Sequence, residues 1–562
     1  MGRIIGQLRH IISPENDTLS YTYDGSLPTS VSWKGTVNGQ VSVTYDSDFR
    51  VTSQSVNEGN AVSFTYDNDG LLIGAGDLSV SRNVQNGLLS GTSLGNVTTN
   101  YSYNAFGEVP GFNAKYNGND LFDTSYELDE IGRISQLTEI VLGDTNIFDY
   151  HYDVAGRLVQ VNRNDTTISV YTYDDNGNRI SHTTSDVTVF GTYNDQDRML
   201  SYGDISYGYS ANGSLKYKAV DGDTTWYKYD NFGNLVAVLL PNNTFIEYII
   251  DGKNRRIGEL INGKFIKGWL YENQFSPVAI LDSLGNIEAR FIYASRDYTP
   301  DYMFKNDSIY QIISDHLGSI RFVVNAITGN ITQQIDYDEF GNELLNTNTA
   351  FQPFGYAGGL YDEETGLVRF GARDYDAKIG RWTAKDPVGF GGGDSNLSVY
   401  VGLDPINVID PLGLKKYIIV NASGYGGVKF FGGEGGTFFI IDRSNNMAYG
   451  FIYGAFGLGP GMGWGVSIEV GEVDLDNPME LTGGGFAISG FATAGKGVSF
   501  QLIGTFKKGI VGESAGFSAG GGAGLNMLFT LTKFYKEYNI SELTTQIKEA
   551  LDSFLKNKSC GE

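Results

Sequence analysis

A short motif recurs through the first half of the chain, and this repetition constrains the fold more than any other feature. Each copy reads aromatic–x–Tyr–Asp with a glycine shortly afterwards, as in 64–70, 150–156 and 227–233. Successive aspartates of the motif are 21 to 24 residues apart, as from Asp153 to Asp174. A repeat of this length is one supersecondary unit, which must stack on its neighbours because it cannot bury its own apolar face.

Each copy predicts two strands joined by a tight turn. The two aromatic residues alternate with another residue, so they lie on one face of a strand. The aspartate and the glycine supply the side-chain acceptor and the left-handed backbone conformation that such a turn needs. We therefore expect a mainly β chain in which hairpins build one continuous sheet, with the tyrosines as packing residues.

Composition divides the chain at about residue 414. Residues 1–414 carry 28 basic and 52 acidic side chains, whereas residues 415–562 carry 12 and 13. Glycine is also denser in the second segment, with 30 of the 75 glycines in 148 residues. Segments that differ this much in charge and glycine content predict different physical roles. The boundary is expected after Leu414, at the end of a stretch that contains Pro411 and Gly413.

Several fixed motifs cover about 100 residues before this boundary. They are Asp-His-Leu-Gly-Ser-Ile-Arg at 315–321, Tyr-Ala-Gly-Gly-Leu-Tyr-Asp at 356–362, Phe-Gly-Ala-Arg-Asp-Tyr-Asp at 370–376 and Asp-Pro-Leu-Gly-Leu at 410–414. Together with the repeats, they resemble the RHS/YD-repeat family over residues 15–414. The end of the resemblance looks like the RHS repeat-associated core.

The resemblance implies hairpins that spiral into a hollow β-shell, with the core region as a plug that cuts the chain after the last motif. It implies a YD-repeat shell at 1–300, a core with an autoproteolytic site at 301–414 and a variable effector at 415–562. The scissile bond would join Leu414 to Lys415. Similar bacterial proteins are polymorphic toxins, including type VI effectors and the C components of Tc toxins. The family's upstream delivery domain is not seen in this sequence.

The resemblance also implies partners and a location. The shell would enclose its own C-terminal fragment, and an immunity protein and a secretion or delivery component would bind the protein. The protein would be secreted or delivered to target cells, although the sequence shows no signal peptide and no apolar run of about 18 residues. The competing hypothesis is a cell-surface adhesion or carbohydrate-binding YD-repeat protein without toxin activity.

The chemistry of self-cleavage can be considered from spacing alone. A hairpin that turns near Gly380 would pair Asp374 with Asp386, with the two carboxylates close enough for one to keep its proton. Such a pair suits acid/base attack by water on an amide, and Arg373 could hold the ionised partner or polarise the carbonyl. The alternative is a set of turn aspartates with an arginine ion pair. The family's Arg-Asp pair and second aspartate match these three residues.

Other polar residues near this hairpin are weaker candidates. Asp376 and Asp404 could take part, whereas His316 is expected to be a structural histidine at a turn. The residue before a proline favours extended backbone, so Asp410 is expected to present an extended substrate strand.

The C-terminal segment has no histidine, one arginine (Arg443) and one cysteine (Cys560). This excludes histidine-dependent nucleases, zinc deaminases and Ser-His or Cys-His hydrolases within 415–562. Strands are predicted at 437–442, 447–456, 463–470 and 498–503, and an amphipathic helix follows Ser541. A cluster of four acidic residues is either catalytic or a solvated loop, and it consists of Glu469, Glu472, Asp474 and Asp476. The glycine-rich alternating strands favour a membrane-active effector, ahead of a histidine-free enzyme and an inert or ligand-binding barrel.

Charge and histidine content limit the remaining functions. The formal net charge of −25 disfavours nucleic-acid binding by the shell, since phosphate would be repelled. The four histidines have no metal-ligand spacing, so the sequence predicts no metal and no cofactor.

Overall fold

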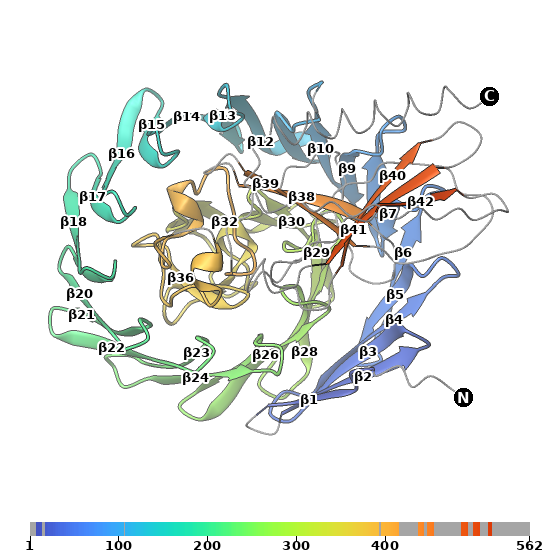
Figure 1. Cartoon of the computed structure of the whole chain (residues 1–562), viewed down its shortest axis with the longest axis horizontal. Coiled ribbons are helices and arrows are strands. Elements are labelled where there is room, and N and C mark those ends of the chain that lie inside the picture. Colours follow the sequence, from blue (N-terminus) through green and yellow to red (C-terminus); the bar gives the residue numbers. More distant parts are fainter. Residues whose placement is uncertain are drawn as a thin grey trace. The chain divides into compact units, whose positions relative to one another are not determined.

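The computed structural model in Figure 1 describes residues 7–13, 17–105, 107–392 and 395–414, together with five strands between 436 and 519. The chain forms two compact units, the first mainly residues 1–416 and the second mainly residues 433–562. Lys415, the acidic cluster 469–476, Cys560 and the predicted elements at 463–470 and after Ser541 lie outside the described residues.

The first unit contains one sheet of 33 strands, here called the shell sheet. Every strand from β1 to β33 pairs antiparallel with the next strand along the chain, so the sheet is a continuous meander. Among the described strands, β1 pairs only with β2 and β33 only with β32, so the sheet is not closed into a barrel. The predicted mainly β fold of stacked hairpins is confirmed.

The first third of the shell sheet spans residues 10–128. Its strands are β1 (His10–Ile12), β2 (Thr18–Asp24), β3 (Leu27–Lys34), β4 (Gly39–Tyr45), β5 (Val51–Val56), β6 (Val62–Tyr66), β7 (Leu72–Ala75), β8 (Leu78–Arg82), β9 (Leu89–Leu94), β10 (Val97–Ser102), β11 (Gly111–Tyr116) and β12 (Asn119–Leu128).

The middle third curves around the core of the unit in Figure 1. Its strands are β13 (Ile134–Val141), β14 (Asp144–Tyr152), β15 (Leu158–Arg163), β16 (Thr166–Tyr173), β17 (Arg179–Thr183), β18 (Thr188–Tyr193), β19 (Met199–Tyr202), β20 (Ile205–Tyr209), β21 (Leu215–Val220), β22 (Asp223–Tyr229), β23 (Leu235–Leu239) and β24 (Phe245–Ile250).

The last third packs against the first. Its strands are β25 (Arg256–Ile261), β26 (Lys264–Tyr271), β27 (Pro277–Leu281), β28 (Ile287–Ile292), β29 (Tyr302–Lys305), β30 (Ser308–Ser314), β31 (Ile320–Asn325), β32 (Ile331–Tyr337) and β33 (Glu343–Asn346).

The turns of the repeats follow the predicted chemistry. The Oδ1 atom of Asp67 accepts hydrogen bonds from the backbone N–H groups of Asp69 and Leu71, at 2.9 and 2.8 Å. Gly70 has φ +81° and donates its N–H to the Asp67 carbonyl at 3.1 Å. The two side-chain contacts recur at eight further aspartates, which are Asp46, Asp129, Asp153, Asp174, Asp230, Asp251, Asp282 and Asp338.

The tyrosine directly before the aspartate of a copy forms a hydrogen bond with the backbone of the preceding copy. The hydroxyl of Tyr66 donates to the Val51 carbonyl at 2.8 Å, and that of Tyr173 donates to the Leu158 carbonyl at 2.7 Å. Arg50, from the preceding turn, lies 5.1 Å from the centre of the Tyr66 ring. The tyrosines therefore link neighbouring repeats, in agreement with their predicted structural role.

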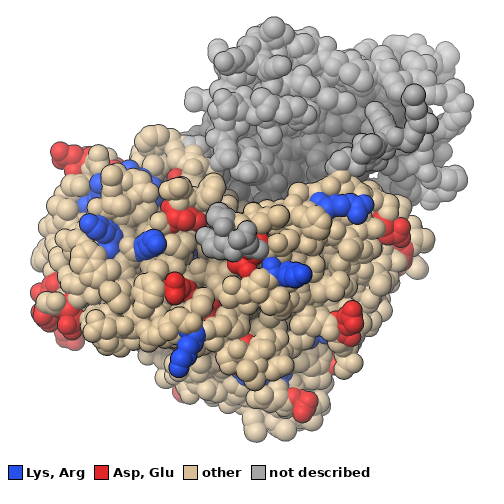
Figure 2. Space-filling model, turned by 90° about the horizontal axis from the view of Figure 1, so that it is seen from below, with Lys and Arg blue, Asp and Glu red and all other residues tan. Residues whose placement is uncertain are grey.

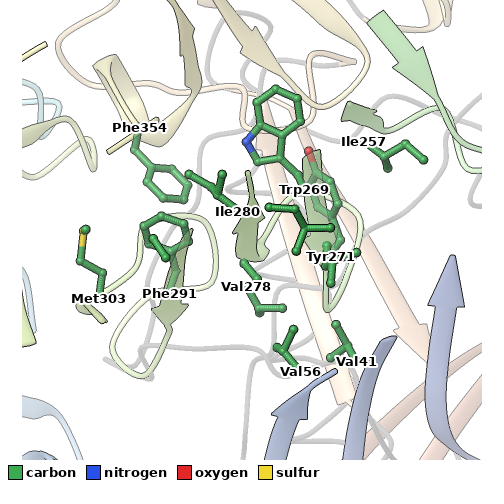
Figure 3. Packing of buried hydrophobic residues seen from close by; sticks show 14 of the residues in the cluster. Val41, Val56, Ile257, Trp269, Tyr271, Val278, Ile280, Phe291, Met303 and Phe354 are labelled. Carbon is green, nitrogen blue, oxygen red and sulfur yellow. The ribbon is translucent and has the colours of Figure 1, made fainter. Parts of the chain in front are cut away.

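The winding of the sheet brings its beginning and its end face to face. Figure 3 shows Val41 and Val56, from the blue strands, opposite Ile257 and Trp269 from the green strands, all within one buried cluster. Polar contacts accompany this packing, because the Gln54 amide donates to a Glu272 carboxylate 218 residues away at 2.6 Å.

A separate four-stranded sheet forms the core sheet of the unit. It consists of β34 (Leu360–Asp362), β35 (Leu367–Phe370), β36 (Arg373–Asp376) and β37 (Arg381–Trp382), with short 3-10 turns η1 (Tyr356–Gly358), η2 (Gly389–Gly392) and η3 (Val401–Leu403) nearby in the chain. In Figure 1 it is yellow and lies on the inner side of the curve made by β13–β24. Leu367 and Ile379 pack there against Tyr207 and Tyr248 of the shell sheet.

The second unit contains two described antiparallel sheets. One pairs β38 (Gly436–Asp442) with β39 (Met447–Tyr453), and the other joins β40 (Gly485–Ala492), β41 (Val498–Thr505) and β42 (Ala515–Ala519). The strands predicted at 437–442 and 498–503 are confirmed in position, and the one predicted at 447–456 is confirmed over its described residues 447–453.

Candidate functional site

The hairpin that carries the predicted catalytic residues has a different register from the one expected. Tyr375 pairs with Trp382 across β36 and β37, and the N–H of Thr383 donates to the Asp374 carbonyl at 2.9 Å. Asp374 therefore lies opposite Thr383, and the prediction that it faces Asp386 was wrong. The reason is that Gly380 ends the turn instead of lying at its centre, since its N–H donates to the carbonyl of Asp376 at 2.9 Å.

The carboxylate of Asp374 is held by two arginines. One oxygen lies 2.7 Å from Arg256 Nη2, on strand β25 of the shell sheet, and the other lies 2.8 Å from Arg369 Nη1 on β35. Only 1% of the Asp374 side chain is exposed. Asp374 thus ties the core sheet to the shell sheet through buried charge-assisted hydrogen bonds.

Arg373 binds a different set of partners. Its Nη2 atom lies 3.1 Å from an Asp386 oxygen and 3.1 Å from an Asp410 oxygen, so these two oxygens are at most about 6 Å apart. Its guanidinium carbon lies 4.1 Å from the centre of the Trp382 ring. The carboxylate pair at this arginine is therefore Asp386 with Asp410.

The last described residues of the first unit, here called the tail (410–414), lie against this arginine. Arg373 Nε donates to the carbonyl of Gly413. The Gly413 N–H donates to the Asp410 carbonyl at 3.2 Å, and the Leu414 N–H donates to Asp410 Oδ1 at 3.2 Å. The tail is thus a tight turn with proline in its second position, and the predicted extended substrate strand was wrong.

Two glycines allow the tail to lie close to the turn between β35 and β36. Gly371 has φ +40°, and a Cβ on it would lie 2.3 Å from the Leu412 carbonyl oxygen. Gly413 has φ +63°, and a Cβ on it would lie 2.3 Å from the Phe370 carbonyl oxygen. A side chain at either position would push the two backbones apart, so this contact explains both glycines.

The weaker candidates have structural partners. Asp376 forms an ion pair with Lys218 at 3.2 Å, and Asp404 accepts a hydrogen bond from the Asn407 amide at 2.7 Å. His316 donates from Nε2 to the Ile406 carbonyl at 2.8 Å, and burial lowers its pKa. These contacts agree with the expected structural role of His316.

Sequence reasoning missed three features of this site. Arg256 and Arg369 hold Asp374, and the Asp410 side chain joins Arg373 to the tail. Arg256 lies 118 residues before Asp374 in the sequence, and no spacing rule connects them. The role of Asp410 could have been predicted from the sequence. Aspartate side chains in tight turns commonly accept hydrogen bonds from the backbone N–H groups that follow them.

Comparison with known proteins shows the family to which this chain belongs. Residues 3–391 match the teneurin YD-shell family. The chain belongs to this family. Among YD-shell relatives, human teneurin-4 is 28% identical over 369 residues, which are 63% of this chain and 13% of that protein. The tRNA nuclease WapA of Bacillus subtilis is 28% identical over 299 residues, which are 52% of this chain and 12% of that protein. The chain therefore spans about an eighth of these relatives.

Solved structures show the same YD-shell fold. A mutant Tc holotoxin pore of Photorhabdus luminescens covers 74% of this chain with a TM-score of 0.54 and 17% identity, and the match is 24% of that chain. The TcdB2–TccC3–Cdc42 crystal structure covers 72% of this chain with a TM-score of 0.51 and 18% identity, over 23% of that chain. The RHS/YD-repeat resemblance and the spiralling β fold are thus confirmed.

The surface of the YD shell carries charges of both signs. On the face shown in Figure 2, basic and acidic side chains are scattered over an uncharged background, without a continuous basic area. Within the described part of the chain, no helix has the length and apolar character needed to cross a bilayer.

Proposed function

We propose that residues 1–414 form a toxin-type YD shell that carries residues 415–562 and frees them by cutting itself after Leu414. The observation that carries this proposal is the anchoring of the tail. Arg373 bonds the Gly413 carbonyl, one peptide before the predicted scissile bond, and also bonds Asp386 and Asp410. A buried arginine that holds the tail beside two carboxylates is suited to hydrolysis of the next peptide bond.

The proposed step is hydrolysis by water, with acid and base catalysis by a carboxyl group. One carboxylate takes a proton from water as its oxygen attacks the Leu414 carbonyl carbon. The carboxyl group formed in this way then gives the proton to the Lys415 nitrogen as the carbon–nitrogen bond breaks, and the carboxylate is restored. Asp386 is the proposed base, and Arg373 holds it against the tail. Asp410 shares this arginine with Asp386 and is proposed to hold the tail as a carboxylate, while Asp374 fixes the strand that carries Arg373.

Expression of the full chain tests this proposal. We expect two co-purifying fragments of 414 and 148 residues, with the new ends verified by mass spectrometry. Asp386→Asn, Asp374→Asn and Asp410→Asn should each leave one full-length band, whereas Asp48→Asn, at an exposed turn, should cut normally. An uncut wild-type chain would refute self-cleavage and favour the surface-protein alternative, which the teneurin-4 similarity supports.

We also propose that the freed segment is a membrane-active effector with a dedicated immunity protein, delivered by a secretion or delivery component. The support is the glycine-rich alternating sequence of this segment, its lack of histidine and its antiparallel sheets. Expression of 415–562 alone in bacteria should stop growth and collapse the membrane potential, as a voltage-sensitive dye would report. Growth arrest at normal potential would instead indicate an enzyme, and unimpaired growth would contradict the toxin proposal.

A further inference from the structure

Three acidic side chains converge at the contact between the shell sheet and the core sheet. Glu259 lies on β25, Asp362 ends β34, and Glu364 lies in the turn between β34 and β35. One carboxylate oxygen from each lies within 4.8 Å of the other two. Glu259 and Asp362 are buried, with 1% and 5% exposure, so the group is shielded from bulk solvent.

The oxygens of this cluster are incompletely paired. Glu259 Oε2 accepts from Lys267 at 3.1 Å, but Glu259 Oε1 is buried and has no hydrogen-bond partner among the described residues. Glu364 Oε2 is in the same situation. Asp362 is satisfied, because Tyr248 donates to one of its oxygens at 2.6 Å and Thr365 to the other at 2.7 Å. A buried carboxylate oxygen without a hydrogen-bond partner is costly, so two such oxygens in one cluster indicate a place where a cation can bind.

Nearby cations do not balance the three carboxylates. Lys267 supplies one positive charge to Glu259. Arg256 Nη1 lies 3.5 Å from Asp362, but its Nη2 is closer to Asp374, at 2.7 Å. The cluster therefore needs either a proton or a bound cation to balance its negative charge.

We propose that Glu259, Asp362 and Glu364 bind a calcium ion. Carboxylates without sulfur or imidazole ligands select hard divalent cations. Calcium–oxygen distances of about 2.3–2.6 Å allow two oxygens of one site to be up to roughly 5 Å apart, and the three oxygens of the cluster, all within 4.8 Å of one another, fall inside this limit. Magnesium demands near-ideal octahedral geometry and keeps several waters, whereas calcium accepts irregular sites built from several protein carboxylates.

The position of this site gives the ion a structural role. It joins strand β25 of the shell sheet to the β34–β35 hairpin of the core sheet, which leads into β36. Arg256 connects the two regions, because it contacts both Asp362 and Asp374. Calcium binding is thus expected to fix the core sheet on the shell sheet. The calcium proposal does not depend on the proposed self-cleavage.

Calorimetric titration of the chelator-treated full chain with CaCl2 tests the site, and thermal unfolding with and without the ion gives a second readout. We expect one calcium per chain and a rise in melting temperature. Glu364→Gln, in a half-buried turn, and Glu259→Gln should each weaken calcium binding at least tenfold. The exposed neighbour Glu363 provides the control, since Glu363→Gln should bind as wild type does.

Three results would overturn the proposal. They are no saturable binding at millimolar calcium, equal binding by wild type and both cluster variants, or binding of MgCl2 in preference to CaCl2. If no saturable calcium binding is found and Glu259→Gln has the melting temperature of the wild type, Glu259 is protonated and the cluster holds no cation.

Discussion

Replacement of Arg373 by alanine should release the tail from the core sheet. The side chain is 3% exposed and forms ion pairs with Asp386 and Asp410, both at 3.1 Å, besides its bond to the Gly413 carbonyl. Removing one partner from a buried ion pair costs about 3–5 kcal/mol, because the other charge stays buried without compensation. Since about 1.4 kcal/mol corresponds to a factor of ten, local opening of the tail should become on the order of 10²- to 10³-fold more frequent.

Native-state hydrogen exchange measures this opening directly. The reporters are the N–H groups of Ala372, Gly413 and Leu414, which all donate hydrogen bonds within or next to the tail. Peptides that contain them should exchange faster in Arg373→Ala, while peptides from the shell sheet should be unchanged. Arg50→Ala is the control, because Arg50 forms a similar ion pair with Asp46 in a partly exposed repeat turn.

Unchanged exchange at 410–414 in Arg373→Ala would refute the anchoring role of this arginine. Faster exchange throughout the first unit would also refute it, since the residue would then support the whole fold instead of the tail.

Three further predictions concern the tail and the repeats. Gly413→Ala should reduce self-cleavage, measured on gels, at least tenfold, because the added Cβ would lie 2.3 Å from the Phe370 carbonyl oxygen. Gly366 has a similar φ of +70° but no close neighbour, so the Gly366→Ala protein should cut itself normally. Tyr173→Phe should lower the free energy of unfolding in urea by about 1 kcal/mol through loss of its bond to Leu158, whereas Tyr207→Phe, whose hydroxyl has no partner among the described residues, should not. Burial, with a smaller contribution from Arg179, lowers the pKa of His182 to about 4 from an ordinary value of 6.5. The unfolded chain therefore binds this proton first, and stability should fall as pH drops from about 6.5 to 4. This part of the pH dependence should vanish in urea titrations of His182→Gln and persist in His151→Gln, whose side chain is exposed. Equal slopes in all three proteins, or equal losses in the paired variants, would contradict these expectations.

The sequence predicted the repeats well because their chemistry is local. The turn at Asp67 is complete within five residues, so its hydrogen bonds follow from residue type and spacing. The register of the hairpin around Gly380 was harder to predict, since a glycine can end a turn or lie at its centre. The observed register differs from the predicted one by three residues, which gives Asp374 a different partner. The role of Arg256 could not be predicted, because only the winding of the sheet brings it to Asp374.

The face-to-face packing of the beginning and the end of the shell sheet also limits how many residues lie between the two parts. Trp33 donates to Asp251 and Gln54 donates to Glu272, and both contacts span 218 residues. At these two contacts one circuit of the sheet thus contains 218 residues, or about ten repeats of 21 residues. Gain or loss of a single repeat inside that circuit would move every facing pair by one unit. The number of repeats within a circuit is therefore constrained by the side chains that face each other across it.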